Sequence, residues 1–352
     1  MERITSHSPE QLSVEGYERV LRCKLGPRGL TCFIVIHSTA RGPAIGTVRM
    51  STYATEEAAL SETLNLAREM TYRACVAGLD CGGAKAIIVG NPTTEKSEAL
   101  FRDFGAVVDS LEGKLIITPD LGIALGDLAM MGPTGTRVAS VWKTQYNPAN
   151  MTALGVFASM KACCEYVYGD PRLKNRTVVV HGAGRVGSRL TQELVHSGAQ
   201  VIVGDIDQRR ADLLVSRFSV KTCSPADIYD QDCDIFAPCA RGGILNERTI
   251  PRLKCRIIVG SARSQLSSPE LANDLFARGI CYVPDYVANA GSLIDITTEQ
   301  GESHAERASH KVKNIGDRVA QILKVSDLKG TPPQAITDRM VADMLSNARL
   351  GR

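Results

Sequence analysis

The sequence lacks the features that point to a membrane, a metal or a nucleic acid. No apolar run approaches the roughly 20 residues of a membrane-spanning helix, and the N-terminal MERITSHSPE has no apolar signal core. The 11 cysteines form no CxxC pair and the six histidines no HExxH motif, so we expect reduced thiols and no metal site. The 41 basic and 38 acidic residues form no block of one sign, which argues against a nucleic-acid partner. We therefore expect a cytoplasmic protein.

Length and patterning instead indicate two α/β domains. A chain of 352 residues exceeds the usual size of one domain. Strand-like and helical segments alternate over residues 29–131, and from residue 176 onward short apolar runs alternate with helical segments, as in a doubly wound parallel sheet. We predict a first α/β domain over residues 1–138, a Rossmann domain over 139–325, and a C-terminal helical segment over 326–352 that packs back on the first domain.

One segment carries the complete fingerprint of a dinucleotide-binding turn, TVVVHGAGRVGSRLTQELVHSGAQVIVGD. Gly182, Gly184 and Gly187 have GxGxxG spacing between an apolar strand and an amphipathic helix, and Asp205 ends the next strand. Such glycines let the backbone approach a diphosphate at the helix N-terminus, while the carboxylate binds ribose hydroxyls and repels a 2′-phosphate. NAD is therefore the predicted cofactor. The arginines of DQRRAD leave NADP as an alternative, and purely structural glycines are another.

A single lysine lies between a glycine pair and an apolar run in GGAKAIIVG. A charge at the mouth of a buried strand is costly unless something pairs with it. Lys85 is therefore either a solvated residue at the exposed end of a strand or a functional residue of an active site.

The motifs taken together resemble those of the glutamate, leucine, phenylalanine and valine dehydrogenase family. They are GPAIGTVRM, EEAALSETLNLAREMTYRACVAGLDCGGAKAII, ITPDLG, MTALGV, HGAGRVG, APCARGGILN and PDYVANAGSLID, in the family's order and over nearly the full length. Within the family, the chain resembles most the cyanobacterial tryptophan dehydrogenase branch.

The resemblance implies an N-terminal substrate-binding and oligomerisation domain, a C-terminal NAD-binding Rossmann domain, and an active site in the cleft between them. It further implies NAD-dependent oxidative deamination of an apolar or aromatic L-amino acid to a 2-oxo acid and ammonia, and the reverse reaction. Relatives form dimers or octamers, so we expect a homo-oligomer.

The resemblance also assigns roles to residues. Lys85 would polarise the substrate carbonyl and the attacking water, and Asp120 would move protons to and from the amine, although an aspartate after Pro119 could instead cap a helix. The expected substrate-binding residues are Ile45, Gly46, Arg73, Ala74, Leu79, Ile116, Arg263, Asn289, Leu293 and Thr297. The expected cofactor-binding residues are Thr152, Gly182, Gly184, Arg185, Val186, Gly187, Asp205, Cys239 and Ala240.

The chain departs from the family's motifs at three places. The lysine of MTYKA, which binds the substrate carboxylate, is Arg73; GGGK is GGAK, with Ala84; and AANNQL is SARSQL, with Arg263 and Ser264. Arginine can bind a carboxylate in a two-bonded fork but is bulkier. Ala84 would add a methyl beside Lys85 and disfavour positive φ, which would change the loop.

We expect a member of the family that is specialised for biosynthesis. Imine reduction or reductive amination of an unusual substrate, and a catalytically silent NAD-binding homologue, are alternatives.

Overall fold

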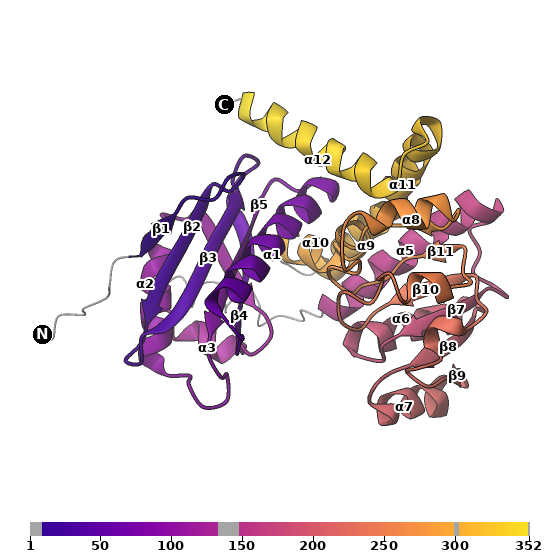
Figure 1. The fold of residues 1–352 in the computed structure, drawn as a ribbon, viewed down its shortest axis with the longest axis horizontal. Helices are drawn as coiled ribbons and strands as arrows, with labels where there is room; N and C mark the ends of the chain where they lie inside the picture. The colour runs from indigo at the N-terminus through magenta and orange to yellow at the C-terminus, as the bar shows by residue number, and fades with distance from the viewer. Residues whose placement is uncertain (1–8, 133–147, 299–302, 351–352) are drawn as a thin grey trace, which may run out of the picture. The chain divides into compact units, whose positions relative to one another are not determined.

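A computed structural model describes residues 9–132, 148–298 and 303–350 (Figure 1). The chain forms two compact units, which are unit 1 (Met1–Tyr146 with Asp343–Arg352) and unit 2 (Asn147–Ala342). Each unit contains its own sheet, so the predicted two-domain α/β class is confirmed. The domain boundary expected at residues 138–139 lies outside the described residues.

Unit 1 is built on a six-stranded mixed sheet of order β1-β2-β3-β5-β4-β6. Strands β1, β2, β3 and β5 pair antiparallel in that order, whereas β4 is parallel to both β5 and β6. The strands are β1 (Glu10–Leu12), β2 (Arg19–Leu25), β3 (Leu30–Ser38), β4 (Ala44–Ser51), β5 (Gly82–Val89) and β6 (Leu115–Pro119). The parallel trio β5, β4 and β6 therefore ends along one edge of the sheet.

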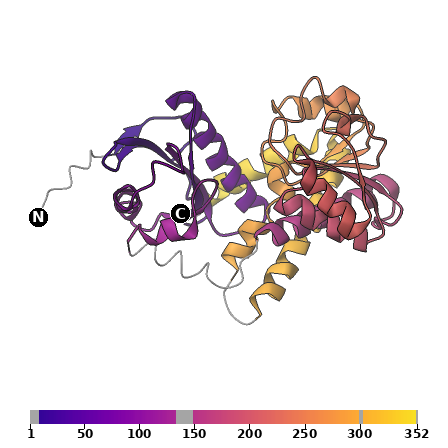
Figure 2. The ribbon, with the colours of Figure 1, turned by 90° about the horizontal axis from the view of Figure 1, so that it is seen from below.

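The two faces of this sheet are covered by different helices, α1 (Glu56–Val76) and α2 (Glu98–Asp109) (Figures 1 and 2). Side chains alternate between the faces with the period of two that strands impose. In β3, Cys32 and Ile34 join the core beneath α2, whereas Phe33 and Val35 join apolar clusters with α1. The helix α1 begins where the Thr55 side chain accepts from the backbone N–H of Ala58. The short helix α3 (Leu125–Ala129) follows β6.

Unit 2 is a doubly wound parallel sheet, as predicted. Its strand order is β12-β11-β10-β7-β8-β9, and every neighbouring pair is parallel. The strands are β7 (Thr177–His181), β8 (Gln200–Gly204), β9 (Lys221–Thr222), β10 (Ile235–Pro238), β11 (Ile257–Ile258) and β12 (Cys281–Tyr282). The helices of this part of the chain are α5 (Pro148–Tyr168), α6 (Arg185–His196), α7 (Gln208–Phe218), α8 (Leu271–Ala277), α9 (Asp285–Ala288), α10 (Gly291–Thr297) and α11 (His304–Lys329), with α12 (Pro333–Leu350) after them.

The long helix α5 is central to unit 2 because it packs against α6, α10 and α11 as well as β11. On the other face of the sheet, Phe236, Ile258 and Leu275 belong to a cluster that includes α8. Among the described residues, no helix has the length and apolar character to cross a membrane.

The helix α1 lies so close to β5 that only glycine fits at the contact. A Cβ placed on Gly83 would lie 2.0 Å from the backbone nitrogen of Thr71. Backbone atoms cannot give way as a flexible side chain can, so an added methyl must push α1 from the sheet.

We therefore expect Gly83→Ala to lower the free energy of unfolding by about 3 kcal/mol. Gly126→Ala is the matched control, because nothing lies within 4 Å of a Cβ at that exposed position in α3. Urea unfolding followed by circular dichroism at one protein concentration measures both. Equal midpoints for the two variants would contradict the close packing of α1 on β5.

A partly buried histidine of β3 makes unit 1 sensitive to acid. The ring of His37 packs edge-on against Tyr17, with ring centroids 5.1 Å apart. Burial, assisted by the nearby positive charge of Arg68, lowers the pKa of His37 to about 4. Between pH 6.5 and about 4 the unfolded chain therefore binds a proton at this position and the folded chain does not.

We expect this difference to reduce the stability of unit 1 by about 3 kcal/mol as the pH falls from about 7 to about 3, with most of the loss between pH 6.5 and 4. His37→Gln removes the titrating ring, so its unfolding free energy should fall less over the same pH range. The test compares how steeply the unfolding free energy falls with pH in the parent and in His37→Gln. The carboxylates that titrate below pH 5 are common to both proteins, so they cancel in the difference between these two slopes. Parallel slopes would show that His37 is protonated in the folded chain.

Candidate active site

Lys85 is fully buried inside the sheet of unit 1. Its strand β5 lies between β3 and β4, and Lys85 pairs in register with Val35 on one side and Thr47 on the other. None of its surface is exposed. The interpretation of Lys85 as a solvated residue at a strand end is therefore wrong. A buried ammonium must be paired and hydrogen-bonded to be tolerated, so its partners define a site.

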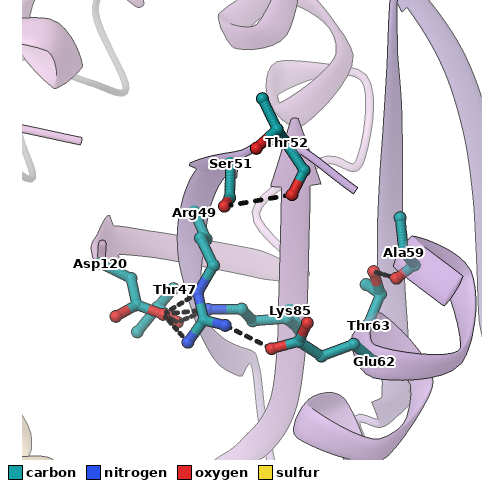
Figure 3. Close-up of polar contacts among 9 residues, drawn as sticks. All are labelled: Thr47, Arg49, Ser51, Thr52, Ala59, Glu62, Thr63, Lys85 and Asp120. Atoms are coloured by element: carbon teal, nitrogen blue, oxygen red, sulfur yellow. Dashed lines mark hydrogen bonds and ion pairs between the residues drawn. The ribbon is translucent and has the colours of Figure 1, made fainter. Parts of the chain in front are cut away.

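Asp120 is the charged partner of Lys85 (Figure 3). The Lys85 Nζ forms an ion pair with Asp120 Oδ2 and donates to Thr47 Oγ1 at 2.6 Å. Asp120 comes directly after β6, where its backbone N–H donates to the Val48 carbonyl at 3.0 Å and so extends the parallel ladder. The next helix begins only at Leu125, so the alternative that Asp120 caps a helix is wrong.

A second cation shares the Asp120 carboxylate. Arg49 Nε and Nη2 lie 3.3 and 3.2 Å from Asp120 Oδ2, and Nη1 forms an ion pair with Glu62 of α1 (Figure 3). Burial alone would lower the pKa of Arg49, but the charges of Asp120 and Glu62 outweigh it and the pKa is raised. The cluster formed by Lys85, Arg49, Asp120 and Glu62 thus places two positive charges beside two negative ones.

Thr47, Arg49 and Glu62 were not predicted as site residues. The available signal was the series of polar side chains at positions 47, 49 and 51 of β4, since residues two apart share one face. Their partners could not be read from the chain, because sequence does not give the register between β4 and β5.

Two of the residues predicted for the side-chain pocket, Ile45 and Ile116, lie on the face of the sheet that carries Lys85. Ile45 of β4 and Ile116 of β6 are partners in register. Ile116 is 39% exposed, whereas its neighbours Leu115 and Ile117 are buried in the core beneath α2. Gly46 also lies in β4, opposite Ala84.

The predicted carboxylate-binding residue, Arg73, lies in the last turn of α1. It is 2% exposed, and its Nη1 lies 3.0 Å from the sulfur of Met70. Ala74 is fully buried beside it, and the backbone N–H of Leu79, just past the helix, donates to the Ala74 carbonyl at 2.9 Å. The guanidinium is therefore held within unit 1 rather than on its surface.

The expected effect of Ala84 on a loop beside Lys85 is not observed. Ala84 lies within β5, and its backbone is not among the described positions with positive φ. It belongs to the core cluster beneath α2, whereas Lys85 faces the α1 side. Because neighbouring residues of a strand point to opposite faces, the extra methyl cannot lie beside the ammonium.

The glycine turn of unit 2 is closely packed at Gly182 and Gly187 and open at Gly184. Gly182 adopts a φ of +113°, and a Cβ on Gly187 would lie 1.8 Å from the Gly182 carbonyl oxygen. Helix α6 begins at Arg185 with Gly184 as its N-cap, without a side-chain capping bond, and nothing lies within 4 Å of a Cβ at Gly184. The side of Gly184 on which a side chain would project is thus open, and a helix N-terminus favours an anion such as a diphosphate. Val186 follows in the first turn.

Asp205 closes this turn from the neighbouring strand. Its Oδ2 accepts from the backbone N–H of Ala183 at 2.6 Å, and the residue is only 7% exposed. The arginines suggested as a 2′-phosphate site, Arg209 and Arg210, instead lie 3.1 and 3.5 Å from Asp207.

Other predicted cofactor-binding residues lie at two places in unit 2. A Cβ on Gly182 would lie 2.8 Å from the backbone nitrogen of Ala240, and the N–H of Cys239 donates to the His181 carbonyl, so the loop after β10 lies beside the turn. Thr152 lies near the start of α5, where its hydroxyl donates to the Pro148 carbonyl at 2.7 Å.

The remaining predicted residues follow β11 and β12. The Asn289 amide donates to the Ser261 carbonyl at 3.4 Å, so Asn289 packs against the SARSQL segment. In that segment Arg263 is partly buried and Ser264 has a φ of +47°, a conformation that serine adopts less readily than the family's asparagine. Leu293 is buried in α10, and the Thr297 hydroxyl donates to the Leu293 carbonyl at 3.0 Å.

Two family models match the chain. One, described as "Glu/Leu/Phe/Val dehydrogenase, dimerisation domain", matches residues 18–155, and the other, "Glutamate/Leucine/Phenylalanine/Valine dehydrogenase", matches residues 203–326. The chain belongs to this dehydrogenase family. The resemblance stated from its motifs is thereby confirmed.

Similar proteins span almost the whole of this family member. The leucine dehydrogenase of Thermoactinomyces intermedius is 39% identical over 96% of this chain and 93% of its own length. The L-tryptophan dehydrogenase of Nostoc punctiforme is 38% identical over 95% of this chain and 95% of its own length. A crystal structure of the L-tryptophan dehydrogenase of that organism matches with a TM-score of 0.80, over 94% of this chain and 97% of that one.

Lys85 and Asp120 differ in burial. We therefore expect the free energy of unfolding to fall by different amounts when one or the other is replaced. Lys85 is fully buried, whereas the side chain of Asp120 is 19% exposed and also contacts Arg49. Asp120→Asn, which leaves the buried ammonium without its counter-charge, should cost about 3 kcal/mol of unfolding free energy. Lys85→Met, which replaces the ammonium by an apolar chain, should cost about 1 kcal/mol. Urea titrations at one protein concentration decide this, and a larger loss in Lys85→Met would contradict it.

Proposed function

We propose that this family member is an NAD-dependent dehydrogenase that converts an apolar or aromatic L-amino acid into its 2-oxo acid and ammonia, and catalyses the reverse. The observation that carries the proposal is the buried ion pair of Lys85 with Asp120. Burying a charge is expensive and gives no stability that an apolar side chain could not give, so a chemical role accounts for it best.

In the proposed reaction Lys85 acts on developing negative charge. When water attacks the iminium carbon and the resulting intermediate collapses to the 2-oxo acid, the ammonium stabilises the oxygen that gains charge. Its position inside a sheet suits this role, because strands hold a side chain with little freedom and exclude water from around it.

Asp120 is the proposed proton carrier. Its carboxylate takes a proton from the substrate ammonium before the C–H bond breaks, and returns one to the departing ammonia. Arg49 Nη2 lies 3.2 Å from Asp120 Oδ2, so a second cation also contacts this carboxylate. Hydride acceptance is the chemistry that the bound nicotinamide supplies.

The proposed cofactor preference rests on Asp205. A carboxylate at the end of β8 can accept from ribose hydroxyls and would repel a 2′-phosphate. Arg209 and Arg210, the residues that could favour NADP, form exposed ion pairs with Asp207.

The proposed substrate is held at its carboxylate by Arg73 and at its side chain by the face that carries Ile45 and Ile116. Arginine offers a planar pair of N–H groups in place of a point charge, so the carboxylate is bound in a different pose. This change supports a specialised, biosynthetic substrate. The match to a family dimerisation domain supports a homo-oligomer, and we extend the proposal to that state.

The test is a panel of L-amino acids with NAD or NADP, and of 2-oxo acids with ammonia and NADH, followed by absorbance of the reduced nicotinamide. We expect turnover of one apolar or aromatic amino acid, with NAD preferred. Lys85→Ala should lose at least about a thousandfold in kcat, while nucleotide binding measured by calorimetry stays unchanged because the glycine turn is intact.

Three outcomes would contradict parts of the proposal. Binding of NAD without turnover of any substrate would indicate the silent homologue. Full activity in Lys85→Ala would remove the assigned mechanism. Leucine, valine or phenylalanine turned over at the ordinary rates of the family would contradict the specialised substrate.

A further inference from the structure

We propose that Thr47 is a positioning residue that holds the Lys85 ammonium in place beside the proton carrier Asp120, an inference that rests on the proposed function. Thr47 was not among the residues expected for this site. Its hydroxyl lies 2.6 Å from Lys85 Nζ and 3.5 Å from Asp120 Oδ2, so it contacts both members of the catalytic pair (Figure 3).

The fold fixes the position of this hydroxyl. Thr47 of β4 is the register partner of Lys85 of β5, and both are in the sheet interior, with Thr47 only 8% exposed. Two backbone ladders hold β4, one to β5 and one to β6, so the strand cannot shift without breaking both. A β-branched side chain also has restricted χ1, so the hydroxyl direction is set by the backbone.

A hydroxyl suits a neighbour whose protonation changes. An ammonium has three donors and no acceptor, whereas a hydroxyl has one donor and two acceptor sites. Thr47 therefore accepts from the charged form of Lys85 while its own proton points toward Asp120. If Lys85 loses a proton, rotation about one bond lets the hydroxyl donate to the amine nitrogen instead. Both protonation states of Lys85 are thus hydrogen-bonded, and neither a methyl group nor a carboxylate could do this.

The geometry also separates the role of Thr47 from that of Arg49. Both contact Asp120, but Lys85 Nζ donates a hydrogen bond to Thr47, whereas the second ion pair of Arg49 is to Glu62. Removing the Thr47 hydroxyl therefore changes the surroundings of Lys85 and leaves the ionic partners of Asp120 in place.

The decisive variants are Thr47→Val, which keeps the shape and removes the hydroxyl, and Thr47→Ser, which keeps the hydroxyl. Thr63→Val is the matched control, because Thr63 is fully buried in the same unit and its hydroxyl donates to the Ala59 carbonyl within α1 (Figure 3). Each variant is assayed with the best substrate of the panel, in water and in deuterium oxide.

We expect Thr47→Val to lower kcat about tenfold, the usual effect of one hydrogen bond to a charged group, with KM for NAD unchanged. The solvent isotope effect on kcat should rise, because proton transfer becomes slower relative to hydride transfer. Thr47→Ser should recover most of the loss and Thr63→Val should match the parent. A kcat within twofold of the parent in Thr47→Val, or a loss that serine does not recover, would overturn the proposal.

A measurement that needs no turnover keeps this proposal separate from the proposed function. Thr47→Val should lower the urea midpoint in the parent, and lower it much less in a Lys85→Met background, where there is no ammonium to hold. If no substrate is turned over but this coupling is found, the proposed function fails while the contact between Thr47 and Lys85 stands. Equal midpoint losses in both backgrounds would overturn the positioning role itself.

Discussion

The cost of burying one ammonium group governs unit 1. Lys85 lies in the middle of a sheet, where an unpaired charge would be prohibitive, so Asp120 must reach it at the end of β6. That meeting is possible because β5, β4 and β6 run parallel, so the end of β6 brings Asp120 beside Thr47 and its register partner Lys85. Gly83 lets α1 approach the same sheet, and the positive charge of Arg49 lies beside the negative charge of Asp120. Both features belong to the same buried arrangement around the Lys85 ammonium.

Much of this architecture could be predicted from sequence, for identifiable reasons. The apolar runs of unit 2 and the GxGxxG turn with Asp205 are local patterns, so they predicted the parallel sheet and the dinucleotide turn. Lys85 and Asp120 were named because motifs of known relatives carry them. The strand β2 was missed, although the partly buried Arg22 and the exposed Lys24 alternate with the buried Leu21, Cys23 and Leu25 in the period of two typical of a strand.

What sequence could not supply was the pairing between strands. The contact of Thr47 with Lys85 depends on the register of β4 against β5, which is set by distant side chains and by the helix above them. The expected effect of Ala84 failed for a related reason, because its neighbour along the chain points to the opposite face of the same strand. Local patterns identify chemical groups, and register decides which of them meet.

The parallel ladder that joins β4 to β5 also limits how this site can vary. Inserting or deleting one residue in either strand would turn its side chains to the other face, moving Thr47 or Lys85 into the apolar core beneath α2. Loops around the sheet can change in length without touching the pair. A change of substrate can therefore come from side-chain replacements or from the loops that connect the strands, whereas the lengths of β4 and β5 must stay the same.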